Sequence, residues 1–440
     1  MKTKEKTKKK LRLPNYLRGK MIAPFLTVVL SGQIIYSAFE AFKGSLMLPL
    51  QEMLGISQTQ YGLLMGYIGI AMFFYVPAGW VNNRFKVRTI LFWSLGFRLA
   101  TYLIIFLFTP SFAILSIVAI SWGVLDAIFW PAVVNGVSIL SADDKEGKGL
   151  AMGLLESVRR LTEFLMNAIV IAAIAMWSNN ALGIMRGFSI AYALLIIPMM
   201  IAVYKYVPDT QIAKEVGKSD SVAAFNGLIK VLARPRVWLA GFAALTVYWS
   251  YVNLMYTSAP YLTEVFGVST AVGAAFGIFN TGLVGIFAGV VSGLLADYVF
   301  HSSTKMMTIS LGMVVAACTI VLLLPGSDGM IWVTLILLVV VAVATFLAKS
   351  VILAPVAELN LPEGISGSAM SVGSFLAYAS IFWAYTLNGS ILDAHAADPA
   401  AGYRIIFMIT AGVALVGALS AGALAIINSR IAAKTKALES

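Results

Sequence analysis

Four charged residues in the first half of the chain are spaced so that they could do chemistry together; they are Glu156, Arg159, Arg160 and Glu163. On a helix, residues three and four positions apart are neighbours, so each glutamate lies beside an arginine. A guanidinium binds a carboxylate or phosphate through two parallel hydrogen bonds, and a glutamate can take up a proton. The quartet therefore fits either a salt-bridge ladder or a substrate site, with arginine anchors and glutamate proton acceptors.

Five further ionisable residues fall inside long apolar stretches, where a charge costs about 2.5–3.5 kcal/mol on insertion scales and often has a function. Arg98 and Asp126 are expected at similar depth, so they could form a structural ion pair. Alternatively Asp126 could titrate, because an apolar surrounding favours a protonated carboxylate. Glu40 and Lys43 could pair with one another or face a cavity. We take Asp126 and Glu40 as candidate proton-coupling residues, and Lys43 and Lys349 as candidates for substrate binding.

Aromatic and amide side chains dominate the corresponding part of the second half. Tyr251 and Asn253 fall in the middle of an apolar stretch, where the usual interfacial role of aromatic residues does not apply. Tyr378 occupies the position that corresponds to Arg160 in an internal repeat. We expect a charged wall from the first half to face a polar, aromatic wall from the second half, with substrate between them.

The amino-acid composition indicates the class of structure that holds these residues in place. The 440 residues are 60% hydrophobic and 12% charged, against about 45–50% and about 25% in soluble domains. A disordered chain needs lower hydrophobicity, and the single cysteine, Cys318, excludes a disulfide scaffold. The remaining class is an all-α polytopic membrane protein.

Hydropathy predicts twelve transmembrane helices, each of which needs roughly 20 apolar residues. Their approximate ranges are 21–46, 60–80, 87–108, 112–140, 149–177, 184–207, 237–262, 270–297, 305–324, 330–356, 366–393 and 403–428. The organisation that follows is a basic cytoplasmic tail, a first six-helix bundle, a cytoplasmic linker, a second six-helix bundle and a cytoplasmic tail. These parts cover residues 1–20, 21–207, 208–236, 237–428 and 429–440.

The net charge of +11 is a topology signal rather than a sign of nucleic-acid binding. With the N-terminus inside, 24 lysines and arginines fall on the cytoplasmic side and 2, Arg186 and Arg404, on the opposite side. Cytoplasmic loops carry this excess in membrane proteins. We therefore expect both termini in the cytoplasm and the protein in the inner membrane.

Three short matches at nearly constant offset indicate that the two halves are repeats. The segment 54–57 corresponds to 266–269, Gly79 to Gly293, and 149–152 to 367–370, with offsets of 212, 214 and 218. Parallel repeats around a central site are typical of secondary transporters.

The segment Gly79 to Arg88 (GWVNNRFKVR) resembles the loop motif of the major facilitator superfamily, and the resemblance covers about residues 20–430. Asn83 stands where that family usually has aspartate, and the copy at 293–298 keeps the acid as Asp297 but has Tyr298 in place of arginine. The resemblance implies two pseudo-symmetric six-helix bundles. It also implies a gating or structural role for the motif and a neighbouring arginine, namely for Gly79, Asn83, Arg84, Arg88, Arg98 and Asp297.

Two further segments resemble particular branches of this superfamily. Tyr36 to Gly62 is similar to the first helix of the organic-anion and organophosphate branches, although Lys43 is the nearest cation to the arginine usual there. The region around helices 10 and 11 looks similar to members near the nitrate-type branch, through Lys349, Pro355, Glu358, Pro362 and Gly367.

These observations predict a monomeric secondary transporter that moves a small polar solute, more often an organic anion, by alternating access with H⁺ symport. Export of amphipathic compounds and a transporter-derived solute sensor are the alternatives. The sequence contains no phosphate-binding GxxxxGK[ST] loop and no nucleophile elbow, and its two histidines suggest no metal site. We therefore expect no enzyme activity, no cofactor and no metal, with the solute, the proton and the lipid bilayer as partners.

Overall fold

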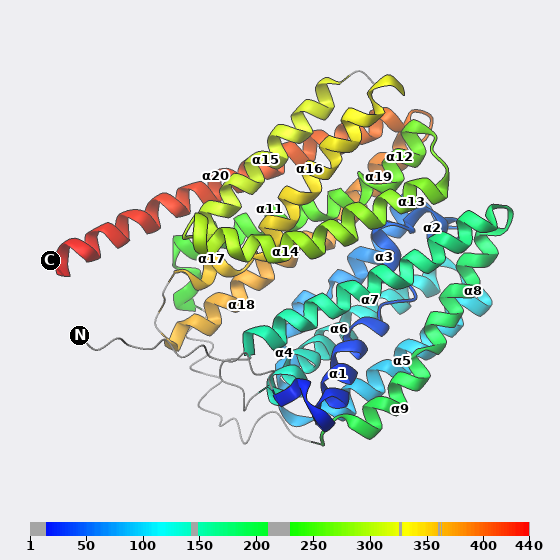
Figure 1. The fold of residues 1–440 in the computed structure, drawn as a ribbon, viewed down its shortest axis with the longest axis horizontal. Helices are drawn as coiled ribbons and strands as arrows, with labels where there is room; N and C mark the ends of the chain where they lie inside the picture. Colours follow the sequence, from blue (N-terminus) through cyan, green and yellow to red (C-terminus); the bar gives the residue numbers. More distant parts are fainter. Residues whose placement is uncertain are drawn as a thin grey trace, which may run out of the picture.

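The computed structural model describes residues 15–141, 148–209, 229–324, 328–359, 361 and 363–439, and every regular element in them is helical. The helices form two bundles that lie side by side, with α20 extending beyond the rest at one end (Figure 1). The first bundle consists of α1 (Ile22–Ile34), α2 (Met47–Leu54), α3 (Gln58–Gly69), α4 (Ala71–Arg84), α5 (Val87–Phe108), α6 (Phe112–Leu140), α7 (Lys148–Met176), α8 (Ala181–Leu194) and α9 (Ile196–Tyr206).

The second bundle is built in the same way and follows the described residues 229–234. It consists of α11 (Pro235–Tyr256), α12 (Ala259–Phe266), α13 (Thr270–Ile278), α14 (Val284–Leu294), α15 (Ser303–Leu323), α16 (Ile331–Ser350), α17 (Ala354–Ala357), α18 (Glu363–Ala379), α19 (Ile381–Ala394) and α20 (Pro399–Glu439). Short π-helical turns, η5 (Phe279–Leu283) and η6 (Leu295–Val299), flank α14. One large apolar core fills the first bundle and continues into adjoining helices of the second, and a further core lies within the second bundle.

In the described part of the chain, nine helices are long and apolar enough to cross a membrane. The expected spans at 21–46, 60–80 and 149–177 are not among them. The first is interrupted between α1 and α2, and the second divides at Ile70 into α3 and α4. The third is the continuous helix α7, which carries the charged quartet. Each departure lies in the first bundle.

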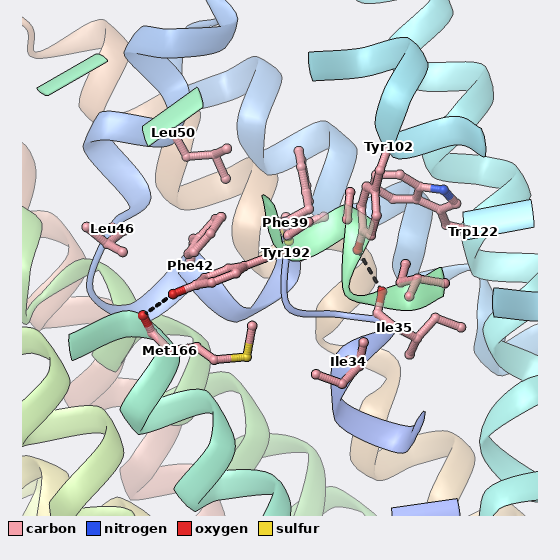
Figure 2. Close-up of a cluster of buried hydrophobic side chains, with 14 of the residues drawn as sticks. Ile34, Ile35, Phe39, Phe42, Leu46, Leu50, Tyr102, Trp122, Met166 and Tyr192 are labelled. Carbon is pink, nitrogen blue, oxygen red and sulfur yellow. Dashed lines mark hydrogen bonds between the residues drawn. The ribbon is translucent and has the colours of Figure 1, made fainter. Parts of the chain in front are cut away.

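The interruption of the first span lies between Ile34 and Met47 and contains a short 3-10 turn, η3 (Glu40–Gly44). Phe39 and Phe42 from this segment are buried in the core of the first bundle, and Figure 2 shows them packed beside Tyr102, Trp122 and Tyr192. The Tyr102 hydroxyl donates to the Ile35 carbonyl at 2.8 Å. Aromatic packing and a replacement hydrogen bond therefore stabilise the non-helical backbone.

The predicted repeat is visible in the local geometry of the two halves. Gly55 and Gly267 end α2 and α12 in the left-handed conformation, with φ of 64° and 63°, which glycine adopts without the usual steric cost. Two residues later Ser57 and Ser269 begin α3 and α13 as N-caps, because each side chain accepts a hydrogen bond from the helix backbone.

The bundles are in close contact at the end of the molecule that carries the 55–58 and 267–270 turns, which we call the far end. There α3 packs along α19, and the Gly62 α-carbon lies against the Tyr385 backbone, where a side chain would collide. Just after the break at Ile70, Phe73 of α4 packs against Phe375 of α18 and Phe382 of α19, with ring centroids 5.7 and 5.9 Å apart. We call the opposite end of the molecule, where α9 ends and α11 begins, the linker end (Figure 1).

Basic residues at the linker end hold the loop after α4 against the end of α9. The Arg88 side chain donates to the Val207 carbonyl at 2.7 Å, which caps the C-terminal end of that helix. Lys86 and Asp209 form an ion pair of 2.8 Å, and the hydrogen bond from Lys86 lowers the pKa of the exposed Asp209 carboxyl. Arg88 therefore lies in a structural contact within one bundle. The side chains of Gly79, Asn83, Arg84 and Asp297 lie outside the described part of the structure.

Candidate functional site

A cavity lies between the two bundles. It is small and partly open to its surroundings in this conformation. The first half lines it through the interrupted helix and α7, and the second half through α11, α13 and η5. Its lining residues from the first half are Ala41, Lys43, Gly44, Ser45, Arg160, Glu163, Phe164 and Asn167. Those from the second half are Tyr251, Met255, Ile278, Thr281 and Gly282.

Three cations from three separate elements lie in or beside this cavity. The Lys349 ammonium on α16 lies 4.5 Å from the centre of the Tyr251 ring, and the Lys43 ammonium lies 6.0 Å from it. Arg160 on α7 lines the same cavity as Tyr251. Both ammonium groups are within the range of a cation–π attraction. The structure thus gathers four of the residues that we predicted for substrate binding.

One described acid lies among these cations. Glu163 pairs with Arg160 at 3.3 Å, and both side chains are about one quarter exposed. The pair has the i,i+3 spacing that the sequence predicted. The side chain of Glu156 lies outside the described part, so its place in the quartet is not seen. The described charged side chains at the cavity are therefore Lys43, Arg160 and Glu163, with Lys349 adjoining them through Tyr251.

Aromatic rings of the second half extend from Tyr251. Tyr248 packs edge-on against Tyr251 and against Tyr378, with centroid distances of 5.3 and 5.1 Å. Phe346 lies on Tyr251 as well, at 5.7 Å. Tyr378 is therefore connected to the cavity through a ring of the same cluster, as expected for a polar, aromatic wall.

Four of the predicted binding residues are not among those that line the cavity. Lys349 and Tyr378 adjoin it through the aromatic cluster, whereas Arg159 and Asn253 make contacts elsewhere. Arg159 donates to the Gly32 carbonyl at 2.9 Å and lies over the Trp130 ring, which directs it toward α1 and α6. Asn253 is fully buried, donates to Thr410 and accepts from Asn388 at 2.7 Å. These contacts join α11 to α19 and α20, so they position helices of the second bundle.

The predicted Arg98–Asp126 pair is present and includes a third member. The Arg98 guanidinium is fully buried and donates to Asp126 at 2.7 Å and to Glu40 at 2.6 Å. The Tyr102 hydroxyl lies 2.9 Å from the second oxygen of Glu40, so its one proton is shared between this carboxylate and the Ile35 carbonyl. Glu40 therefore pairs with Arg98 and not with Lys43, which lies near the Tyr251 ring. Two carboxylates share one guanidinium in this cluster.

Two polar residues of the cavity were not predicted from the sequence, because they carry no charge and lie in apolar segments. Asn167 lines the cavity and donates to the Ala41 carbonyl at 2.8 Å and to Ser45 at 3.3 Å. Thr281 lines it from η5. A π-helical turn frequently marks a functional position, but its sequence, FNTGL, contains no signal that predicts one.

The far end is closed by a polar network between the bundles. The Asp393 carboxylate of α19 accepts from the backbone nitrogens of Gln58 and Thr59, at 3.1 and 2.8 Å, at the N-terminus of α3. The Gln58 side chain donates to Glu264, which also accepts from Tyr403 at 2.6 Å. Partial burial raises the pKa of the Glu264 carboxyl, and these hydrogen bonds oppose the shift.

Two helical bundles with repeated local geometry and a charged cavity between them are the architecture of a secondary transporter. A model of the Major Facilitator Superfamily matches residues 25–385. The chain belongs to this family, and it is a membrane transporter rather than an enzyme.

Two curated relatives are inner membrane proteins of Escherichia coli (strain K12). The chain is 26% identical to inner membrane protein YihN over 377 residues, which cover 80% of this chain and 88% of the relative. It is 21% identical to inner membrane protein YqcE, with 84% and 86% covered. The chain is accordingly a multi-pass inner membrane protein.

Solved transporter structures share the fold at low sequence identity. A nucleoside transporter, NupG, matches with a TM-score of 0.73 and 12% identity, covering 91% of this chain and 99% of that one. An inward-facing, unoccupied bacterial homologue of the human lysosomal transporter Spinster matches with a TM-score of 0.68 and 13% identity, covering 94% and 98%. The predicted class of fold is thus confirmed.

Proposed function

We propose that the protein carries a small organic anion across the inner membrane by alternating access, coupled to H⁺ symport. In this proposal residues 1–20, 208–236 and 429–440 are cytoplasmic, and residues 21–207 and 237–428 form the two moving bundles. The linker end then faces the cytoplasm and the far end faces the outside. The protein works as a monomer, since one chain supplies both walls of the cavity.

The observation that carries the anion assignment is that Lys43 and Lys349 lie at the Tyr251 ring and Arg160 lines the same cavity. Lys43 and Arg160 belong to the first half and Lys349 to the second. An anion between them makes favourable contacts with both bundles at once. A ligand that bridges both halves also stabilises the state in which they approach one another, which is what alternating access needs.

The proposed proton sites are Glu40 and Asp126, with Glu163 beside the cavity. When both carboxylates of the Arg98 cluster are ionised, the buried cluster has one negative charge in excess. Binding one proton removes that excess, and burial of an uncompensated charge is costly. Glu40 lies three residues from Lys43 in the interruption between α1 and α2, so protonation at Glu40 would act on a segment that also lines the cavity.

Flux through purified protein in liposomes tests the coupled transport. Labelled organic anions should enter faster when the outside is acidified relative to the lumen, and the ionophore that collapses the gradient should remove the acceleration. Stimulation by the opposite gradient would support export by antiport, and binding without flux would support a solute sensor. Either of these results would contradict the proposed symport.

Two single substitutions test the two walls of the cavity. Arg160→Ala removes a cation, and Tyr251→Phe removes the hydroxyl of the tyrosine that lines the cavity while it keeps the ring beside Lys43 and Lys349. We expect both variants to reduce uptake at least tenfold at equal expression, since each removes a contact worth about 1.5–3 kcal/mol to a charged group. Normal uptake by both variants would refute the proposed site.

A further inference from the structure

The side-chain amide of Asn167 on α7 is buried, and only its nitrogen has hydrogen-bond partners among the described residues. Its nitrogen donates to the Ala41 carbonyl and to Ser45, while its oxygen, Oδ1, has no hydrogen-bond partner among the described residues. The side chain is only 4% exposed. A buried acceptor without a partner is destabilising, so this oxygen needs a donor from elsewhere.

The orientation of this amide is determined by its surroundings. Rotating it by half a turn would place Oδ1 against the Ala41 carbonyl, so that two acceptors would face each other with no hydrogen between them. The nitrogen must therefore point to the interruption between α1 and α2, and Oδ1 is the atom left over. The interrupted helix fixes which atom of Asn167 is available.

The cavity distinguishes Asn167 from other buried asparagines. In the described residues, four buried asparagines have an unpartnered Oδ1, and they are Asn82, Asn167, Asn280 and Asn388. Of these, Asn167 lines the cavity together with the cations Lys43 and Arg160. Asn167 is therefore the one of these four asparagines beside which a ligand in this cavity would lie.

The charge of the cavity limits what that donor can be. Lys43 and Lys349 adjoin Tyr251 and Arg160 lines the same cavity, and these three cations repel a ligand that donates through an ammonium group. A hydroxyl donates without a positive charge. Thr281, on the opposite wall, uses its own proton to bond the Gly277 carbonyl at 2.7 Å, so its oxygen remains able to accept from a second hydroxyl.

Resting on the proposed anion transport, we propose that the substrate is a hydroxylated organic anion of the hydroxy-acid or sugar-acid type, and that Asn167 recognises one of its hydroxyls through Oδ1. The anionic group lies among the three cations. The hydroxyl satisfies the buried amide oxygen. Anions without a hydroxyl leave that oxygen unpartnered and bind about tenfold to 100-fold more weakly.

Matched pairs of anions test this specificity on the purified, full-length protein. Glycerate is compared with propionate, and 3-hydroxybutyrate with butyrate, by calorimetric titration and by the shift in thermal unfolding. The wild type should prefer the hydroxylated member of each pair at least tenfold. Equal affinity within both pairs would overturn the inference and leave the anion proposal standing.

Substitution of Asn167 separates recognition from structural support. Asn167→Ala should bind the two members of each pair with similar affinity, because the oxygen that distinguishes them is gone. Asn388→Ala is the matched control, since Asn388 is equally buried with an unpartnered oxygen but does not line the cavity; this variant should keep the preference. A preference that survives in Asn167→Ala would contradict the assignment. If that variant does not fold, the wild-type comparison decides.

Neutral polyols distinguish this inference from the proposed function. Glycerol and sorbitol should bind far more weakly than glycerate, and Lys349→Gln should weaken glycerate binding at least tenfold. If the polyols bind as well as glycerate, and Lys349→Gln has no effect, the anion proposal fails. Loss of their binding in Asn167→Ala would in that case still support hydroxyl recognition by Asn167.

Discussion

Single residues show how the protein tolerates charges in its core. Arg98 has no exposed surface, and it holds Glu40 and Asp126 from two other segments. The ring of Trp122 lies 4.4 Å from the guanidinium carbon. An arginine suits this position because its planar fork can serve two carboxylates and stack on an aromatic ring at the same time.

Replacing Arg98 should be strongly destabilising. Arg98→Met leaves two buried carboxylates without a counter-charge, and breaking a buried ion pair in this way costs about 3–5 kcal/mol. We expect a clear fall in the unfolding temperature in detergent. Arg404→Met is the control, because Arg404 is exposed and bonds a single carbonyl, and it should have little effect. An Arg98→Met protein as stable as the wild type would contradict this role.

Glu264 should make the far end sensitive to pH. Its pKa is raised in the folded protein, so the folded state binds its proton more tightly than the unfolded state does. The stability that it contributes is present at low pH and is lost as the pH rises through the folded pKa. Glu264→Gln should therefore flatten the fall in unfolding temperature above about pH 4.5. An unchanged pH profile in this variant would show that Glu264 does not contribute.

The sequence identified the charged residues better than it identified their partners. It predicted the Arg98–Asp126 pair because both residues fall at a similar depth in their predicted spans. It also predicted as binding residues four that lie in or beside the cavity, namely Lys43, Arg160, Lys349 and Tyr251. It did not place Glu40 on Arg98, because an unbroken helix would have set Glu40 beside Lys43. Asn167 was missed, since an uncharged side chain within an apolar helix gives no signal.

At the scale of elements, the interrupted first span is the main difference from expectation. The segment 35–46 is apolar enough for a continuous helix, and no proline lies in it. The contacts that hold it open come from distant parts of the chain, through Tyr102, Arg98 and Asn167. Local sequence could not reveal it, whereas the repeated turns at Gly55 and Gly267 were visible as a repeat.

The α3–α19 contact is expected to act as the outer gate. We expect the Asp393 carboxylate to keep this gate closed. Asp393→Asn removes the negative charge from the N-terminus of α3, where a carboxylate is favoured. We expect the far end to open more often. The measurement is the distance between spin labels at Glu52 and Ala397, both exposed, in a Cys318→Ala background.

The variant should show a larger population of long distances than the parent protein. Asp398→Asn is the matched control, because the Asp398 carboxylate accepts from the Ala401 nitrogen at the start of α20, within the second bundle, and should leave the distances unchanged. Identical distance distributions for Asp393→Asn and the parent would show that the carboxylate does not hold the gate.

At the scale of the whole molecule, the two bundles contribute different kinds of side chain. The first bundle contains the Arg98 cluster, the interrupted helix and the paired charges of α7. The second contributes aromatic rings and Lys349. The pattern of repeats and the charge distribution were sufficient to predict this two-bundle organisation. The closed far end and the cavity between the halves depend on contacts between residues hundreds of positions apart, which a single sequence does not reveal.

The most direct measurement of the central claim is a thermal-shift screen of the purified protein with small carboxylates, phosphates and neutral sugars. A ligand that binds the folded state raises its stability by RT ln(1 + [L]/Kd), about 2.7 kcal/mol at one hundred times Kd. We predict that organic anions raise the unfolding temperature, and that Lys349→Gln removes most of this shift. Stabilisation by neutral sugars alone, with no response to any anion, would contradict an anion transporter.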